Sequence, residues 1–248
     1  MKVLLFADYE GERFLMIENL LFQNLLDISK TIAAPLFDGV KYPWEVLPHI
    51  SEFICKIGTE LPKDEYKQID ENIWVSVEAN IAPTAYLHGP LIICPKAEVR
   101  HCAFIRGSAI VGSGAVVGNS TELKNCILFD NAQVPHYNYV GDSILGYKAH
   151  MGAGSITSNL KSDKSMVHVS TFEGRLQTGL KKMGAIVGDM AEIGCNSVLN
   201  PGTVVGRCTN VYPLSMVRGY IPPHTIYKHQ GEIVGKAAVK PVSVGFCE

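Results

Sequence analysis

Apolar residues recur every six positions along two long stretches of this chain, and a small residue follows four positions later in most of these hexads. The apolar positions are Ile81, Leu87, Ile93, Val99, Ile105, Val111, Val117, Leu123 and Phe129, then Val187, Ile193, Leu199, Val205, Val211 and Val217. Burial along a helix recurs at three and four residues, whereas a period of six is typical of a parallel β-helix. The sequence therefore predicts an all-β fold, with a triangular β-helix between residues 73 and 221.

The first 72 residues lack this period. Met1–Phe6 reads as a strand, and the apolar spacing over Phe14–Ile32 predicts a helix. A second helix is predicted over Trp44–Ile57. Residues 1–72 are therefore expected to form a small α/β or helical cap segment, followed by a β-helix domain over residues 73–248.

One segment, residues 158–182, interrupts the hexads. The turn signal at Glu173-Gly174 predicts a looped-out hairpin. Its cationic residues outnumber its two acids, so we expect the hairpin to approach the phosphate end of a substrate. These cations are Lys161, Lys164, Arg175, Lys181 and Lys182. The tail after Pro222 is expected to pack along the outside of the β-helix.

Composition limits the possible partners and compartment. The net charge of -2 argues against a general nucleic-acid binder, which would carry a basic excess. No apolar stretch reaches the length of about twenty residues needed to cross a bilayer, and the N-terminus lacks a secretory cleavage pattern. The seven cysteines are scattered, with no CxxC pair, as expected for reduced thiols. We therefore expect a cytoplasmic protein without membrane or nucleic-acid partners.

Candidate chemistry lies in residues 106–159, where HxxYVGD, MGAGSIT and a trailing Asn follow in order. This stretch resembles the acetyltransferase half of the bifunctional enzymes that make UDP-N-acetylglucosamine from glucosamine 1-phosphate. It also resembles the related bifunctional sugar-1-phosphate nucleotidylyltransferases, which have a TGLKKMGAIVGD-like return into the repeats. The resemblance implies a left-handed β-helix, a homotrimer with sites between subunits, and acetyl-CoA as co-substrate.

The same resemblance assigns roles to individual residues. His136 matches the catalytic base, a role suited to imidazole because it titrates near the working pH. Arg106 and Lys124 match cationic residues around the sugar phosphate. Tyr139 and Asn159 match further substrate-contacting positions. The implied reaction is direct attack of an amino sugar on acetyl-CoA, with no covalent acyl-enzyme.

The cofactor is expected to meet Ala153, Cys195 and Pro213, and the main-chain N–H of Ala153 is expected to face the thioester. A main-chain N–H suits the oxyanion that develops as the amine attacks. Three positions depart from the family pattern. His150, a further substrate-binding candidate, replaces an Asn; Leu160 replaces an aromatic residue; and Cys195 replaces a Ser in the CoA groove.

The bifunctional relatives begin with a nucleotidyltransferase domain that has a Gly-rich, Arg-containing loop. The first seventy residues here are too short for that domain and contain no such loop. We therefore expect UTP-dependent uridylyl transfer to be missing from this chain.

Two other functions fit a β-helix. A metal-dependent carbonic anhydrase needs three histidines at one metal. The eight histidines include only one close pair, His224 and His229, so no metal site is predicted. A non-catalytic protein that binds a sugar nucleotide, or a regulatory subunit, is the second alternative. Intact His136, Arg106 and Lys124 speak against it, and Leu160 and Cys195 speak for it.

Overall fold

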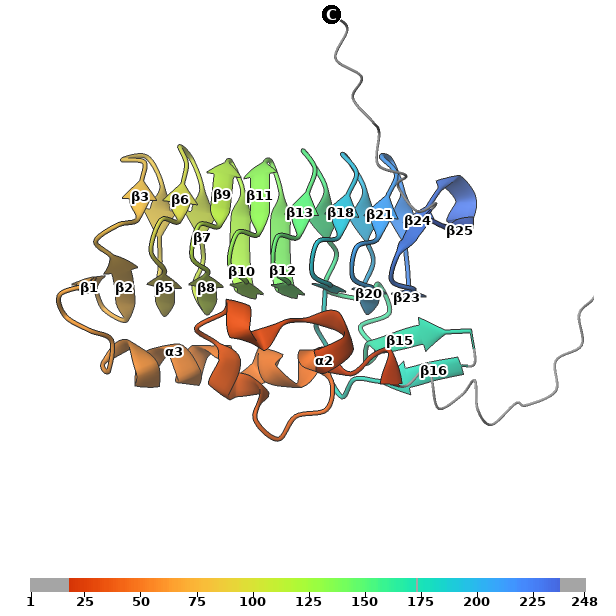
Figure 1. Cartoon of the computed structure of the whole chain (residues 1–248), viewed down its shortest axis with the longest axis horizontal. Helices are drawn as coiled ribbons and strands as arrows, with labels where there is room; N and C mark the ends of the chain where they lie inside the picture. The colour runs from red at the N-terminus through yellow and green to blue at the C-terminus, as the bar shows by residue number, and fades with distance from the viewer. Residues whose placement is uncertain (1–17, 173, 237–248) are drawn as a thin grey trace, which may run out of the picture.

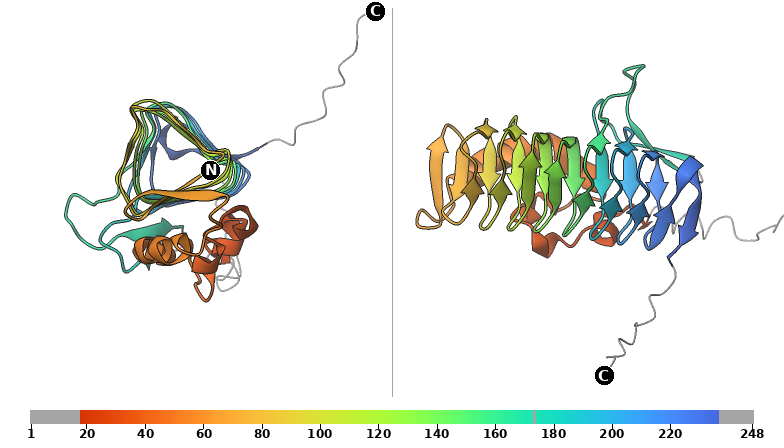
Figure 2. Two further views of the ribbon diagram at one scale, coloured as in Figure 1. Left: turned by 90° about the vertical axis from the view of Figure 1, so that its left-hand side faces the viewer. Right: turned by 90° about the horizontal axis from the view of Figure 1, so that it is seen from above.

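The computed structural model describes residues 18–172 and 174–236, and it shows a parallel β-helix with a triangular cross-section (Figure 1 and Figure 2). Short strands from successive coils pair in parallel along each side of this prism. The architecture predicted from the six-residue period is therefore confirmed. The predicted strand Met1–Phe6 lies outside the described residues.

We name the three sides of the prism the covered face, the open face and the third face. The covered face comprises β2 (Ile73–Ser76), β5 (Leu91–Ile93), β8 (Ala109–Val111), β17 (Ala185–Val187), β20 (Thr203–Val205) and β23 (Tyr220–Ile221). The open face comprises β4 (Tyr86–Leu87), β7 (Phe104–Ile105), β14 (Ile156–Thr157), β19 (Val198–Leu199) and β22 (Met216–Val217). The third face comprises β3 (Asn80–Ile81), β6 (Glu98–Val99), β9 (Val116–Asn119), β11 (Gln133–His136), β13 (His150–Met151), β18 (Glu192–Ile193), β21 (Asn210–Val211) and β24 (Thr225–Tyr227).

Four longer or terminal strands complete the β-helix. Both β10 (Glu122–Leu128) and β12 (Tyr139–Leu145) continue around a corner, from the open face to the covered face. At one end, β1 (Tyr66–Asp70) pairs antiparallel with β2. At the other end, β25 (Ile233–Gly235) pairs antiparallel with β24, and the 3-10 helix η4 (His229–Gly231) joins them. The regular coils thus extend to Tyr227, beyond the predicted end at residue 221.

The interior of the prism is filled by the apolar residue of each hexad, as predicted. The small residue four positions later is also buried, except for half-buried Ala85 near the first coil, and where it is Ser or Thr its hydroxyl bonds to a corner carbonyl. Ser197 Oγ donates to the Tyr212 carbonyl at 3.1 Å, and Thr209 Oγ1 donates to the Pro222 carbonyl at 2.7 Å. These bonds satisfy backbone carbonyls that would otherwise be buried without a partner.

One expected interior residue, Phe129, is instead outside the prism. Leu123 pairs with Val140 and Leu128 with Leu145, so this coil contains 17 residues, whereas Ile93 and Val111 in an earlier coil are 18 apart. The shorter coil moves Leu128 into the interior and turns Phe129 outward. Its ring meets that of Phe37 with centroids 6.1 Å apart. The strict six-residue register therefore fails after Leu123.

The covered face carries a continuous row of outward-pointing apolar side chains, one for each coil. The row consists of Trp74, Ile92, Ile110, Ile127, Ile144, Ile186, Val204 and Tyr220. The N-terminal segment lies along this face (Figure 1 and Figure 2) and buries the row in a second apolar core. Two layers of apolar side chains therefore meet across this one sheet face, one inside the prism and one outside.

The N-terminal segment is mainly composed of short helical turns. They are α2 (Phe22–Leu25), η1 (Ile28–Lys30), η2 (Ala34–Phe37), η3 (Pro43–His49) and α3 (Ile50–Gly58). The helix predicted over Phe14–Ile32 is not continuous in its described part, residues 18–32, where non-helical residues separate helical Glu18, α2 and η1. Leu20, Leu25 and Leu26 are buried along the covered face, and this packing overrides helical spacing. The helix predicted over Trp44–Ile57 is confirmed in part, as η3 followed by α3. None of the helices within residues 18–172 and 174–236 is long and apolar enough to cross a membrane.

A buried carboxylate ties this segment to the coils. Asp189 accepts the backbone N–H groups of Asp27 and Tyr147, each at 2.8 Å, and pairs with Arg207 at 3.2 Å. Burial raises the pKa of Asp189, while these bonds act in the opposite direction. Three separate parts of the chain thus converge on one side chain.

The insertion forms the predicted antiparallel hairpin, from β15 (His168–Thr171) and β16 (Gly174–Gln177). It extends the cover of the covered face, because Val167 and Val169 are fully buried in the second apolar core, as is Met183 directly after the insertion. Its cations Lys164, Lys181 and Lys182 stay exposed.

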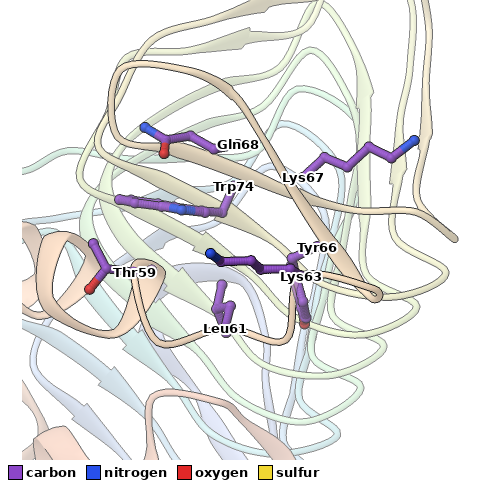
Figure 3. Close-up of a pocket in the computed structure, with 8 residues that line it drawn as sticks. Thr59, Leu61, Lys63, Tyr66, Lys67, Gln68 and Trp74 are labelled. Atoms are coloured by element: carbon purple, nitrogen blue, oxygen red, sulfur yellow. The ribbon is translucent and has the colours of Figure 1, made fainter.

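Figure 3 shows a pocket at the first coil, where the end of α3 meets β1. Its volume is about 570 Å³, and Trp74, Leu61 and Lys63 are among the residues that line it. Gly58 lies against the Trp74 indole, where a Cβ would come within 2.4 Å of the ring. This pocket is formed by the start of the prism, and the residues of the candidate site below come from later coils.

Replacing Ile110 with Ala should lower the free energy of unfolding by about 2–5 kcal/mol, because Ile110 is fully buried between β8 and α3. Urea denaturation measures this change. Ile69→Ala is the control: Ile69 is 55% exposed on β1, and its replacement should change stability by less than about 0.5 kcal/mol. Equal losses for the two variants would contradict a buried covered face.

Candidate active site

The predicted base and the predicted cofactor residues occupy equivalent positions in successive coils. The Gly154 N–H donates to the His136 carbonyl at 3.0 Å, and the Asn196 N–H donates to the Ala153 carbonyl at 2.9 Å. The next bond in this ladder joins the Leu214 N–H to the Cys195 carbonyl, also at 2.9 Å. The residues thus aligned along the corner between the third face and the open face are His136, Ala153, Cys195 and Pro213, which we name the corner row. Successive members are about 4.8 Å apart, the usual spacing of paired strands.

Both key groups of the corner row are available to a ligand. The His136 side chain is exposed, and its ring has no hydrogen-bond partner within the described residues. In the same part of the chain, the Ala153 N–H has no acceptor, although the N–H groups on either side of it are bonded. A base and a main-chain donor therefore lie one coil apart on the same corner.

Buried Asn138 holds the backbone of this corner. Its side-chain oxygen accepts the His136 N–H at 3.1 Å. Its amide nitrogen donates to the Gly152 and Ser155 carbonyls at 2.9 and 3.0 Å. One amide therefore joins the turn after His136 to the turn that contains Ala153. Sequence reasoning missed this residue, because a buried Asn within a motif gives no separate signal.

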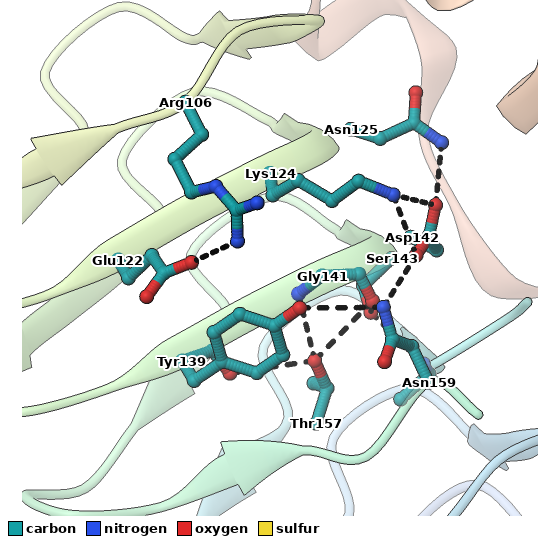
Figure 4. Close-up of polar contacts among 11 residues, drawn as sticks. Arg106, Glu122, Lys124, Asn125, Tyr139, Gly141, Asp142, Ser143, Thr157 and Asn159 are labelled. Carbon is teal, nitrogen blue, oxygen red and sulfur yellow. Dashed lines mark hydrogen bonds and ion pairs between the residues drawn. The ribbon is translucent and has the colours of Figure 1, made fainter. Parts of the chain in front are cut away.

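Four of the predicted substrate residues gather on the adjoining open face, as Figure 4 shows. They are Arg106, Lys124, Tyr139 and Asn159. Tyr139 begins β12 only three residues after His136, so this cluster is continuous with the corner row. These four residues therefore lie together beside the corner row.

Asp142 is the centre of this cluster. It is almost fully buried, and its carboxylate lies 3.0 and 3.1 Å from Lys124 Nζ. Asn125 Nδ2 donates to it at 2.8 Å, and Asn159 Nδ2 donates to its other oxygen. The buried charge is thus paired and hydrogen-bonded, as a buried carboxylate requires. Asp142 closes the HxxYVGD motif, so the motif itself was the signal for a residue that was not assigned.

The second cation of the cluster is paired at the surface. Arg106 Nη1 lies 2.7 Å from Glu122 Oε1, and both side chains remain partly exposed. This bond raises the pKa of Arg106. Because exposed ion pairs contribute little stability, an incoming anion can replace Glu122 at small cost. Glu122 was not identified from the sequence.

Neighbouring residues set the pKa of Tyr139 and the position of its ring. Burial, followed by the charges of Asp142 and Glu122, raises its pKa, so the hydroxyl stays protonated as a donor. Asn159 Nδ2 donates to the same hydroxyl at 3.3 Å. The ring folds over Gly141, where a Cβ would lie 2.5 Å from the phenol oxygen. Any side chain at Gly141 would displace the Tyr139 ring.

His150 lies apart from this cluster. It is on β13 of the third face, where it pairs with Gln133, and its Nδ1 lies 2.9 Å from Glu192 Oε2. It precedes Ala153 by three residues and so flanks the corner row rather than the cations.

Leu160 is 42% exposed and bridges to Lys182 at the root of the insertion. Within residues 18–172 and 174–236 no three His, Cys, Asp or Glu side chains are grouped as metal ligands.

Comparison with known proteins shows which families this chain is similar to. Residues 87–171 match the family described as the GMPPB C-terminal domain. A bifunctional protein GlmU from Methanococcus maripaludis is 33% identical over 189 residues, which are 74% of this chain and 46% of the relative. This chain is homologous to the C-terminal half of such bifunctional proteins. It spans about half the length of the GlmU relatives that it matches.

Other relatives have related names. A bifunctional sugar-1-phosphate nucleotidylyltransferase/acetyltransferase from Sulfurisphaera tokodaii is 30% identical over 115 residues, 46% of this chain and 29% of that one. A putative uncharacterized acetyltransferase, YaiX, from Escherichia coli is 29% identical over 169 residues, 67% of this chain and 73% of that one. Among solved structures, an N-acyltransferase from Bacillus cereus in complex with dTDP and coenzyme A aligns with a TM-score of 0.38 and 15% identity, over 71% of this chain and 92% of that one.

Replacing Asn138 with Ala should cost about 1–3 kcal/mol of stability, because several buried polar groups lose their partner. The Gly154 amide should also exchange its hydrogen faster, since its bond to the His136 carbonyl loses support. Urea denaturation and amide hydrogen exchange measure the two effects. Asn119→Ala, in the preceding coil, removes only exposed bonds, one to the His101 carbonyl and one from Ser120 Oγ, and should have a smaller effect. Unchanged exchange at Gly154 would exclude Asn138 as the support of this corner.

Proposed function

We propose that this protein is an acetyl-CoA-dependent N-acetyltransferase whose acceptor is an amino sugar carrying a phosphate or a nucleotide. The alignment of His136 with Ala153, Cys195 and Pro213 along one corner carries this proposal. The names of the relatives agree with it, since both YaiX and the Sulfurisphaera protein are named as acetyltransferases. The identity of the acyl group, acetyl, and that of the acceptor, an amino sugar, are both part of the proposal.

In the proposed reaction, acetyl-CoA lies along the corner row. The acceptor amine attacks the thioester carbonyl, and His136 takes the proton that the amine loses. The Ala153 N–H donates to the oxygen on which negative charge develops. The C–S bond then breaks, the amide forms, and CoA leaves as a thiol after receiving the proton. Because the amine attacks directly, no group on the protein is acylated.

The adjoining cluster would hold the acceptor. A phosphate at Arg106 would replace the exposed Glu122 carboxylate and gain charge-assisted hydrogen bonds. Lys124 stays paired with Asp142, so its ammonium would not be free to bind the phosphate. Its positive charge would still attract and orient the phosphate. The Tyr139 hydroxyl would donate to a sugar oxygen beside His136.

His136→Ala should lower the rate of acetyl transfer about a hundredfold or more and leave CoA binding nearly intact, because a base acts in the transition state. Steady-state kinetics with glucosamine 1-phosphate and UDP-glucosamine, together with CoA calorimetry, separate the two effects. His101→Ala is the matched control, since His101 has the equivalent position two coils earlier and its Nδ1 lies 2.9 Å from Thr84 Oγ1. Full activity of His136→Ala across about pH 6 to 9 would remove His136 from the mechanism. Binding of both ligands by the wild type without any turnover would favour the non-catalytic alternative.

We also propose that the protein is a homotrimer with its sites between subunits. The N-terminal segment already covers one face of the prism, and the open face exposes Tyr86, Phe104 and Met216 beside the candidate site. Closed cyclic symmetry buries such surfaces without leaving a free one.

Sedimentation should therefore give three chains of 27.1 kDa each. Phe104→Glu should shift the protein toward the monomer, because a charge would be buried in the contact. Glu78→Gln, an exposed change next to Val77 on the first coil, should leave the trimer intact. A monomer at all working concentrations would exclude sites between subunits.

A further inference from the structure

A second pocket lies where the insertion leaves the β-helix. It has a volume of about 280 Å³, and its walls come from the first residues of the insertion and from the corner of two later coils. Lys161 contributes from the insertion, and Asn200 and Arg218 contribute from the coils. None of these three residues belongs to the candidate site described above.

The insertion is held rigidly against the coils near this pocket. Gly202 and Gly219 both have positive φ, and a Cβ on either would come within 2.5 Å of a carbonyl oxygen of β15. Their missing side chains allow the hairpin backbone to touch the corner directly. Val167, just before this strand, and Val169 within it are fully buried in the second apolar core, which also holds the strand in place. The pocket is therefore preformed and does not depend on closure of a free loop.

The charge around the pocket is positive. Only 20% of the Lys161 side chain is exposed; its Nζ donates to Ser165 Oγ at 2.5 Å and lies 3.6 Å from Asp163, whose own side chain is 62% exposed. Arg218 Nη2 is 3.5 Å from Asn200 Oδ1, a weak contact that leaves most of its N–H donors for a ligand. Burial and the charges of Arg175, Lys161 and Arg218 lower the pKa of His168 on β15. Several cations therefore act on one small region, and Asp163, the acid among the described residues that line the pocket, is mostly solvated.

The pocket lies on the same coils as three members of the corner row. The Ser158 N–H donates to the Leu199 carbonyl and the Asn200 N–H to the Val217 carbonyl, so Ser158, Asn200 and Arg218 form a row of their own. Each lies five residues after a member of the corner row, which is at most about 18 Å of extended chain. A molecule bound along the corner row can therefore place a charged group in this pocket.

We propose that Lys161, Arg218 and Asn200 form a pocket that binds a phosphate group. Two charged donors and an amide around a small polar cavity suit the oxygens of a phosphate, and Asp163 can turn toward solvent when the phosphate enters. The phosphate belongs to one of the two substrates of the proposed reaction, either CoA or the phosphorylated acceptor. The source of the phosphate rests on the proposed function, whereas the chemistry of the pocket does not.

Calorimetry with the full chain tests the pocket, using wild type, Lys161→Ala, Arg218→Ala and the double variant. The probes are CoA, 3′-dephospho-CoA, pantetheine, glucosamine 1-phosphate, glucosamine and inorganic phosphate. Each single replacement should weaken the phosphate-bearing ligand about tenfold or more, because a hydrogen bond to a charged group is lost. Affinity for the matching ligand without phosphate should not change. Lys161→Arg should restore binding, and Lys67→Ala, an exposed lysine on β1, is the control.

The pattern of losses identifies the source. Weaker CoA with unchanged pantetheine assigns the pocket to the cofactor, and weaker glucosamine 1-phosphate with unchanged glucosamine assigns it to the acceptor. If wild type and double variant bind every phosphate-bearing probe, inorganic phosphate included, with equal affinity, the pocket proposal is overturned while the proposed enzyme stands. If the wild type fails to bind CoA, the proposed function falls. Loss of inorganic phosphate binding in the variants would then still support the pocket.

Discussion

The parallel backbone ladder is the constraint on which the rest of this structure depends. Each coil repeats the one before it after 16 to 18 residues, or after 42 where the insertion intervenes, and each strand bonds to its counterpart in the next coil. Residues that are far apart in sequence thereby become neighbours at a fixed spacing. His136 and Pro213 share one corner because three coil steps separate them, not because a loop brings them together.

The outer apolar layer adds stability that a bare prism would lack. A sheet face whose side chains are apolar on both sides must be covered on the outside as well as the inside. Here the cover comes from two parts of the same chain: the N-terminal segment, and the hairpin that contributes Val167 and Val169. Asp189 joins the N-terminal segment to the coils through hydrogen bonds and one ion pair. The side that carries the candidate site stays free of this cover.

Paired charges shape the candidate site. Lys124 is bound to a buried carboxylate, and Arg106 is bound to an exposed one. The two cations therefore differ in what they can do for an anionic ligand. Releasing Lys124 would leave Asp142 buried without its counter-charge, which is costly. Exchange of Glu122 takes place at the surface, where solvent screens the loss.

The six-residue period alone determined the β-helix. Each coil shows the same short pattern of interior side chains, so the pattern can be read from any part of the repeat. The motifs of residues 106–159 located most of the candidate site, because motif residues keep their offsets within a coil and the coils stack in register. The outer apolar row was visible in the sequence as paired apolar residues such as Ile92-Ile93 and Ile110-Val111, but nothing local indicated what would cover it.

Only the tertiary structure decided the remaining features. The 17-residue coil moved Phe129 outward, because one residue fewer shifts which side chain reaches the interior. The leucines expected to form a long N-terminal helix instead pack against the covered face. The free energy gained by burying them there outweighs their helical propensity. Asn138, Asp142 and the Lys161–Arg218 pocket depend on contacts between coils 17 residues or more apart in sequence. The spacing of residues along one strand does not predict such contacts, because they form only when the coils stack.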